Sequence, residues 1–379
     1  MTPRSGPTPK PPGGSTAGEA RSVSVPPAGT ALPATTGWLL RGKDGRLTAY
    51  APTDGGVLRW TEARVGGPGW AGPDLLAVAG LLPYLSVAQS AEGFVHLLGV
   101  RARPCADGPD ELDLVHAIQF QTGRPLRDWQ SLGNPHGKDR AKGAQIGMPS
   151  HVLDDTGSVQ LFLRNTNGGL SAKRQAPSGR WHPWGGANPR GTLLTGESAA
   201  AVTDHGTIDL LVPAGDAVVR WLREKADGEL VRAEDEPRVK VAPGTITAER
   251  TGPGRLTHFW RDAGNGTVRA WRPGAEPASL GGRGTGPPAL LRTPVDGYDC
   301  TILAQRGTDG HPSIAAYPTE HEEAGLHWTR TGERCAGAPA LALDGLGRVV
   351  LAAIGEDGTL RVTRQKAEPG LALEPWTRI

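Results

Sequence analysis

Two tryptophans with a histidine between them, Trp181 and Trp184 around His182, are the residues of this sequence best suited to recognise a ligand. An indole ring stacks on the apolar face of a pyranose, and its N–H can donate to a sugar hydroxyl. The chain has 11 tryptophans against four tyrosines and four phenylalanines, an excess that fits sugar recognition. We therefore take Trp181, His182 and Trp184 as the first carbohydrate-binding candidates.

Single tryptophans recur further along the chain and are candidates for the same chemistry: Trp129, Trp328 and Trp376. Recurrence at equivalent positions is also what packing between repeats produces, so each of them has a structural interpretation as well. A polar, basic segment adds candidates for a rim loop, because insertions in repeat proteins often lie on the binding face: His136, Lys138, Arg140 and Lys142. Such a segment is also typical of a solvated loop.

Sequence motifs for catalysis, metals and cofactors are missing. The nearest approach to a serine hydrolase motif, Gly196 to Ala200, lacks its second glycine. No HExxH occurs, and we interpret His321 to Glu323 with His327 as a charged turn. No glycine-rich loop has the strand and helix that dinucleotide binding needs. We therefore predict no catalytic residue, no metal and no cofactor.

The segment that contains the tryptophan pair, from Gly147 to Trp184, has the pattern of four β-strands separated by turns. Its second strand alternates with the period of two that β-structure requires, with two sets of side chains on opposite faces: Val159, Leu161 and Leu163, against Gln160, Phe162 and Arg164. We expect the Asn167-Gly168 pair to supply the positive φ angles of a tight hairpin turn. The segment therefore predicts a four-stranded antiparallel meander.

The chain contains seven copies of this unit, and most of their starts are separated by roughly 40 to 50 residues, the length of one propeller blade, with a longer interval after the second start. The predicted fold is all-β, a seven-bladed β-propeller over residues 37–379, with blades at approximately 37–74, 81–134, 147–187, 195–240, 244–282, 286–332 and 336–379. The second copy carries an insertion from Arg101 to Asp110. The last copy ends with its own fourth strand near Trp376, and Arg21 to Pro27 is a candidate for an edge strand, so the mode of ring closure stays open.

The first 36 residues are rich in Pro, Gly, Ser, Thr and Ala, and we expect them to form a flexible tail. They lack the apolar segment of a signal peptide, and no run in the chain is long enough to span a bilayer. We expect a cytoplasmic protein, with export by an unconventional route left open. Cys105, Cys300 and Cys335 form no CxxC pair, and we expect them to be buried as small apolar residues.

The unit from Pro149 to Trp184 resembles a blade of the Photorhabdus-lectin-like and tectonin-type β-propellers. The resemblance rests on its proline, the Asp-x-x-Gly turn at Asp154 to Gly157, the strand Val159 to Arg164, the Asn-Gly turn and the closing Trp-x-x-Trp. As a repeat pattern it covers residues 37–379, although only the third copy keeps both closing tryptophans. It implies a propeller with shallow sugar pockets between adjacent blades.

A formal net charge of +2 gives this chain no overall attraction to nucleic acid. We expect a glycan or a protein as partner, with neither nucleic-acid binding nor membrane insertion. The principal prediction is non-catalytic, lectin-like carbohydrate recognition between blades. Two alternatives stay open: a protein-interaction scaffold that uses rim loops, and an enzyme whose central channel would carry inward residues such as His151, Glu197 and Glu249.

Overall fold

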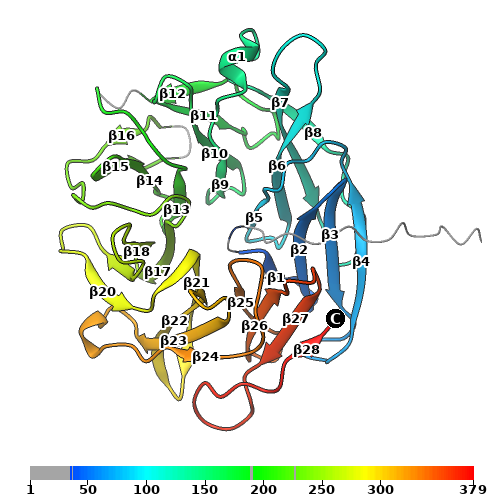
Figure 1. Cartoon of the computed structure of the whole chain (residues 1–379), viewed down its shortest axis with the longest axis vertical. Coiled ribbons are helices and arrows are strands. Elements are labelled where there is room, and N and C mark those ends of the chain that lie inside the picture. Colours follow the sequence, from blue (N-terminus) through cyan, green and yellow to red (C-terminus); the bar gives the residue numbers. More distant parts are fainter. Residues whose placement is uncertain (1–34, 36, 188–190, 226–227) are drawn as a thin grey trace, which may run out of the picture.

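The protein is a ring of seven four-stranded antiparallel sheets, as predicted. The computed structural model describes residues 35, 37–187, 191–225 and 228–379. Each sheet is a meander of consecutive strands, and the first strands of neighbouring sheets lie side by side around the centre of the ring (Figure 1). We number the sheets as blades 1 to 7 in chain order.

Blades 1 to 4 occupy the first part of the chain. Blade 1 contains β1 (Leu39–Arg41), β2 (Leu47–Thr53), β3 (Gly56–Glu62) and β4 (Trp70–Ala77). Blade 2 contains β5 (Ser86–Gln89), β6 (Val95–Arg103), β7 (Glu111–Gln119) and β8 (Gln130–Gly133). Blade 3 contains β9 (Ser150–Leu153), β10 (Val159–Arg164), β11 (Leu170–Arg174) and β12 (Gly185–Ala187). Blade 4 contains β13 (Ala199–Val202), β14 (Ile208–Ala214), β15 (Ala217–Arg223) and β16 (Val231–Arg232).

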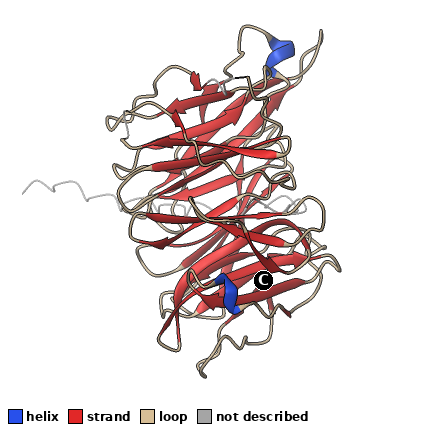
Figure 2. Ribbon diagram, turned by 90° about the vertical axis from the view of Figure 1, so that its left-hand side faces the viewer, coloured by secondary structure: helices blue, strands red, loops and turns tan. Residues whose placement is uncertain are grey.

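Blades 5 to 7 complete the ring. Blade 5 contains β17 (Thr247–Gly252), β18 (Arg255–Arg261), β19 (Val268–Trp271) and β20 (Ala278–Gly281). Blade 6 contains β21 (Gly284–Val295), β22 (Tyr298–Gly307), β23 (Pro312–Pro318) and β24 (Thr329–Arg330). Blade 7 contains β25 (Ala340–Leu343), β26 (Val349–Ile354), β27 (Leu360–Arg364) and β28 (Thr377–Arg378). In the described residues, helix is confined to α1 (Arg140–Gly143) and the 3-10 turn η1 (Glu322–Ala324), so strands dominate the side view (Figure 2).

The alternation predicted for β10 is confirmed by its packing. Leu161 and Leu163 belong to a cluster with residues of blade 2, whereas Phe162 belongs to a cluster with residues of blade 4. Because successive side chains of a strand point to opposite faces, one strand contributes to both blade interfaces. Stacking the blades in this way buries the two apolar faces that an isolated meander would expose.

The turn between β10 and β11 differs from the tight Asn-Gly turn that we expected. Gly168 has φ +72°, but Asn167 does not have a positive φ. The N–H of Gly168 donates to the carbonyl of Asn165 (3.0 Å), and the side chain of Asn165 accepts from the N–H groups of Asn167 and Gly169 (3.0 Å each). The hairpin is therefore a longer loop in which one left-handed glycine is enough, because the Asn165 amide satisfies the other turn donors.

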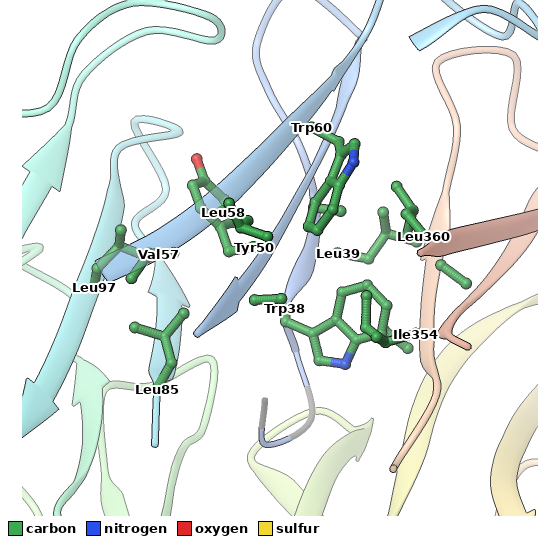
Figure 3. Packing of buried hydrophobic residues seen from close by; sticks show 14 of the residues in the cluster. Trp38, Leu39, Tyr50, Val57, Leu58, Trp60, Leu85, Leu97, Ile354 and Leu360 are labelled. Atoms are coloured by element: carbon green, nitrogen blue, oxygen red, sulfur yellow. The ribbon is translucent and has the colours of Figure 1, made fainter. Parts of the chain in front are cut away.

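Blade 1 is built from β1 to β4 and blade 7 from β25 to β28, so no sheet combines strands from both ends of the described chain. Side-chain contacts between blades 1 and 7 therefore close the ring. The indole N–H of Trp38 donates to the carbonyl of Ala338 (3.3 Å). Trp38 and Leu39 share one buried cluster with Ile354 and Leu360 (Figure 3). The proposed edge strand from Arg21 to Pro27 lies outside the described residues.

The three cysteines are all free. Cys300 and Cys335 are buried as expected, but Cys105 is only half-buried, because it lies in the loop between β6 and β7, which contains the insertion. Among the described residues, no helix has the length and apolar character required to cross a bilayer.

Candidate functional site

Tryptophans recur directly before the outermost strand of a blade, and four of the sequence candidates occupy this position: Trp129, Trp184, Trp328 and Trp376. Each packs on a cluster that its own blade shares with the preceding blade. The N–H of Trp328 donates to the carbonyl of Leu280 (3.0 Å), and the N–H of Trp376 donates to Oγ1 of Thr331 (2.9 Å). These two donors are therefore used inside the protein, and sugar contact by Trp129, Trp328 or Trp376 stays a prediction.

Replacing Trp328 with phenylalanine tests the structural contribution of this position. The variant keeps an aromatic ring but loses the bond to Leu280, so we expect the free energy of unfolding in urea to fall by about 1 kcal/mol. Trp129→Phe is the matched control, because Trp129 occupies the equivalent position before β8 and no hydrogen bond joins its indole N–H to a described residue. Equal losses in the two variants would show that the Leu280 bond contributes nothing.

The tryptophan pair and its histidine do not form one site. Trp181 and Trp184 pack toward blade 2, where the Trp181 ring meets the His116 ring edge-on at 5.6 Å between centroids. Both indole nitrogens are buried without a hydrogen-bond partner among the described residues. His182 instead lines a groove toward blade 4. The predicted constellation is thus divided between two interfaces, because neighbouring residues of an extended segment point in opposite directions.

The groove that His182 lines, between blades 3 and 4, has a volume of about 690 Å³ and is the main candidate site. We call it the 3–4 groove. Its wall on blade 3 includes the end of β11, and β12 contributes Gly185 and Gly186, so part of this wall is bare backbone. A Cβ at Gly185 would meet no atom within 4 Å, which shows how open this wall is. Blade 4 contributes the side chains of Trp221, Arg223 and the segment Glu229–Arg232.

Arg223 is held in the 3–4 groove by a buried polar network. Its Nη1 donates to Oε1 of Gln160, and Nε2 of Gln160 donates to Oδ2 of Asp154 (2.8 Å). The guanidinium carbon lies 5.8 Å from the centre of the Phe162 ring. Burial lowers the pKa of Arg223, the positive charge of Arg174 lowers it further, and the carboxylate of Asp154 acts in the opposite direction. The groove therefore holds a pre-positioned guanidinium.

The sequence contains two signals of this groove that were not among the predicted site residues. The first is the Gly185-Gly186 pair directly after Trp184, because glycine in a strand often marks a close backbone approach. The second is the arginine at the end of each facing strand, Arg174 and Arg223. Neither signal reveals that the two arginines share a groove, since they belong to different blades.

A second groove lies between blades 6 and 7 and has a volume of about 480 Å³. Its lining is more apolar, with Ala315 and Ala316 of β23 facing Leu371 and Leu373 of blade 7. His327 also lines this groove. His321, which the sequence analysis grouped with it, instead contacts Glu323, with 3.1 Å between Nδ1 and Oε1. The two grooves occupy equivalent places in the repeat but differ in chemistry.

The basic rim segment contains the short helix α1, whose first turn is capped by the side chain of Asp139. Arg140 and Lys142 lie in α1, His136 precedes it, and Lys138 is exposed. An Arg140 Nη1 donates to the carbonyl of Asp107 (3.4 Å), so the rim segment contacts the insertion of blade 2. The two insertions thus lie together at the rim, and their binding role stays a prediction.

The mouth of the central channel forms a cavity of about 530 Å³. His151 and Glu197 both line it, and Oγ of Ser86 lies 2.9 Å from Nδ1 of His151. Burial lowers the pKa of His151 to about 3. Glu249 is not among the residues that line the cavity, and burial raises its pKa. In the described part of the chain, no group of His, Cys, Asp or Glu residues is arranged to hold a metal ion.

The fold is a seven-bladed β-propeller with grooves between adjacent blades. No protein-family model matches the chain, and no curated protein sequence matches it either. Among solved structures, it is similar to the BP39L lectin from Burkholderia pseudomallei, with 16% identity over 93% of this chain and 99% of that chain and a TM-score of 0.64.

Two further solved structures are related in fold. A putative 6-phosphogluconolactonase from Bacteroides fragilis shares 15% identity over 89% of this chain and 94% of that chain, with a TM-score of 0.59. A PL25 ulvan lyase shares 11% identity over 89% of this chain and 94% of that chain, with a TM-score of 0.53. At such identities the similarity establishes the fold, because propellers with unrelated functions share this architecture.

Proposed function

We propose that this protein is a non-catalytic carbohydrate-binding propeller that holds a saccharide in the 3–4 groove. The observation that carries the proposal is the groove itself, whose volume of about 690 Å³ falls within the usual range for ligand sites. Its position between adjacent blades is where a lectin-like propeller is expected to hold sugar. The similarity to the BP39L lectin in fold supports the same conclusion.

The chemistry of the groove suits a polyol. Guanidinium and imidazole groups supply N–H donors from Arg174, Arg223 and His182, and the carboxylate of Glu229 supplies acceptors. A sugar hydroxyl both donates and accepts, so it can use donors and acceptors that are fixed close together. The glycine-lined wall of β12 allows a ring to approach the backbone, which a larger side chain would prevent.

Gly185→Leu is the most direct test of this site. Gly185 has an ordinary φ and open space around its Cβ position, so leucine should reduce the volume of the groove without straining the fold. We expect saccharide affinity to fall by about tenfold or more, with an unchanged urea midpoint. A glycan array would identify the ligand, and isothermal titration calorimetry would measure its affinity.

Ser178→Leu is the control for this experiment. Ser178 is an exposed residue of the same blade that does not line the groove, so leucine there should leave saccharide binding unchanged. Wild-type protein that binds no saccharide at millimolar concentration would contradict the proposed function. Equal affinity of Gly185→Leu and wild type would exclude the 3–4 groove as the site.

A further inference from the structure

We infer that the mouth of the central channel binds a small aliphatic amine, whose ammonium group is held by Glu197 and by the hydroxyl oxygens that line the same cavity. Most of the lining comes from the first strands of blades 2 to 5, which lie around the centre of the ring (Figure 1), or from the segments directly before them. The cavity of about 530 Å³ falls within the usual range for ligand sites. It shares no described lining residue with the 3–4 groove, so the inference goes beyond the proposed saccharide function.

The cavity is lined by six hydroxyl side chains: Thr35, Tyr84, Ser86, Ser150, Ser198 and Thr247. Three of these hydroxyls already donate to backbone carbonyls of the protein. The bonds run from Thr35 to Leu85 (2.9 Å), from Tyr84 to Pro149 and from Thr247 to Pro288 (3.3 Å). A hydroxyl has one proton and two lone pairs, so a hydroxyl whose proton is already donated can only accept from a ligand.

The two serines at the junction of blades 3 and 4 are used in the same way. Oγ of Ser198 donates to the carbonyl of Phe162 (3.3 Å), and Oγ of Ser150 lies 2.8 Å from Oγ of Ser198. Because Ser198 has no second proton to give, the proton between the two oxygens comes from Ser150. These serines therefore also present acceptors to the cavity.

Glu197 adds a negative charge beside these acceptors. It is half-buried, and no hydrogen bond or ion pair joins its carboxylate to another described residue. Burial raises the pKa of Tyr84 and the charge of Glu197 raises it further, so the carboxylate lies close to this hydroxyl. Burial lowers the pKa of His151 to about 3, so its ring is neutral at pH 7.

An ammonium group is the ligand group that such a lining suits best. It has three N–H donors and no acceptor, and its hydrogen bonds to a carboxylate are strengthened by charge. A sugar hydroxyl must also accept, and the five hydroxyls described above have no proton left to donate to it. Apolar side chains of the same cavity offer a surface for the hydrocarbon part of an amine: Val87, Met148 and Ile246.

A matched pair of ligands tests the role of the ammonium group. Pentylamine and 1-pentanol have the same carbon chain and differ in one terminal group, which is charged in the amine at pH 7. By calorimetry on the full chain, we expect pentylamine to bind about tenfold more tightly or better than pentanol. Its affinity should fall as the salt concentration rises from about 0.05 to about 0.5 M, whereas that of pentanol should not change.

Glu197→Gln should remove the advantage of pentylamine and leave pentanol binding unchanged, because glutamine keeps the shape of the side chain and loses its charge. Glu234→Gln is the control, since Glu234 is an exposed residue directly after blade 4 that does not line the cavity. Both variants should keep the urea midpoint of the wild type, which shows that they fold equally well.

Three results would overturn the amine site. They are no binding of pentylamine by the wild type at millimolar concentration, equal binding of pentylamine and pentanol, and equal amine affinity in Glu197→Gln and Glu234→Gln. Gly185→Leu separates this site from the saccharide site, because Gly185 lines only the 3–4 groove of the two cavities. This variant should bind pentylamine as the wild type does, and loss of the amine there would place it in the 3–4 groove and contradict the inference. Failure to bind any saccharide would leave the amine site standing.

Discussion

Glu62→Ala should lower the free energy of unfolding by about 3 to 5 kcal/mol, because it breaks a buried ion pair where the ring closes. Glu62 is fully buried at the end of β3, and its Oε1 accepts from Nη2 of Arg364 (2.9 Å) in blade 7. Its Oε2 accepts from the N–H of Leu47 (3.0 Å). Without Glu62, the one carboxylate that the described residues still offer the buried guanidinium of Arg364 is the more distant Asp344, 3.8 Å away. Urea unfolding measures the loss.

Two further variants show whether burial is the cause. Glu356→Ala removes an ion pair with Arg334 whose side chains are about half exposed, and it should change stability by less than about 1 kcal/mol. Glu62→Gln keeps an acceptor for Leu47 but loses the charge, and should fall between wild type and Glu62→Ala. A loss below about 1 kcal/mol in Glu62→Ala would mean that this pair does not hold blades 1 and 7 together.

Acidification from pH 7 to pH 5 should cost the protein several kcal/mol of stability, because three buried histidines lie between blades 2 and 3. Burial lowers the pKa of His96 to about 4, and that of His116 and His151 to about 3. Nδ1 of His96 lies 3.1 Å from Nε2 of His116, so a proton on one ring is repelled by a proton on the other. The carboxylate of Glu92 acts to raise the pKa of His96, but its effect is smaller than that of burial.

Stability falls on acidification because the unfolded state takes up more protons than the folded state. An unfolded histidine titrates near pH 6.5 and gains a proton below it, whereas the folded rings stay neutral until about pH 4. The unfolded state therefore binds more protons between these values, and stability falls as the pH falls. Each histidine lowers the free energy of unfolding by about 1.4 kcal/mol for every pH unit between 6.5 and the pKa of its folded ring.

Urea unfolding at a series of pH values gives the free energy of unfolding as a function of pH. The slope of this function gives the difference in the number of bound protons between the unfolded and folded states. His116→Gln should reduce the slope by about one proton between pH 6 and pH 4.5. His205→Gln, at a histidine whose side chain is 71% exposed, should leave the slope unchanged. Stability that stays constant from pH 7 to pH 5 would contradict neutral burial of these rings.

The sequence alone determined the repeat and hence the fold, because the signals of a blade are local. Alternation along β10 predicted which side chains face each neighbouring blade, and the packing of Leu161 and Phe162 confirmed it. Turn glycines such as Gly168 marked the ends of the strands. Such signals depend on residues within a few positions of one another, so a single sequence contains them in full.

Only the tertiary structure decided which residues share a site, because the angle and spacing between blades bring together residues that are distant in the chain. It separated His182 from Trp181 and Trp184, and it placed Arg223 beside Gln160, 63 residues earlier. It also joined Glu62 to Arg364 across 302 residues. These contacts depend on how whole sheets stack, and no local pattern of residue types records that geometry.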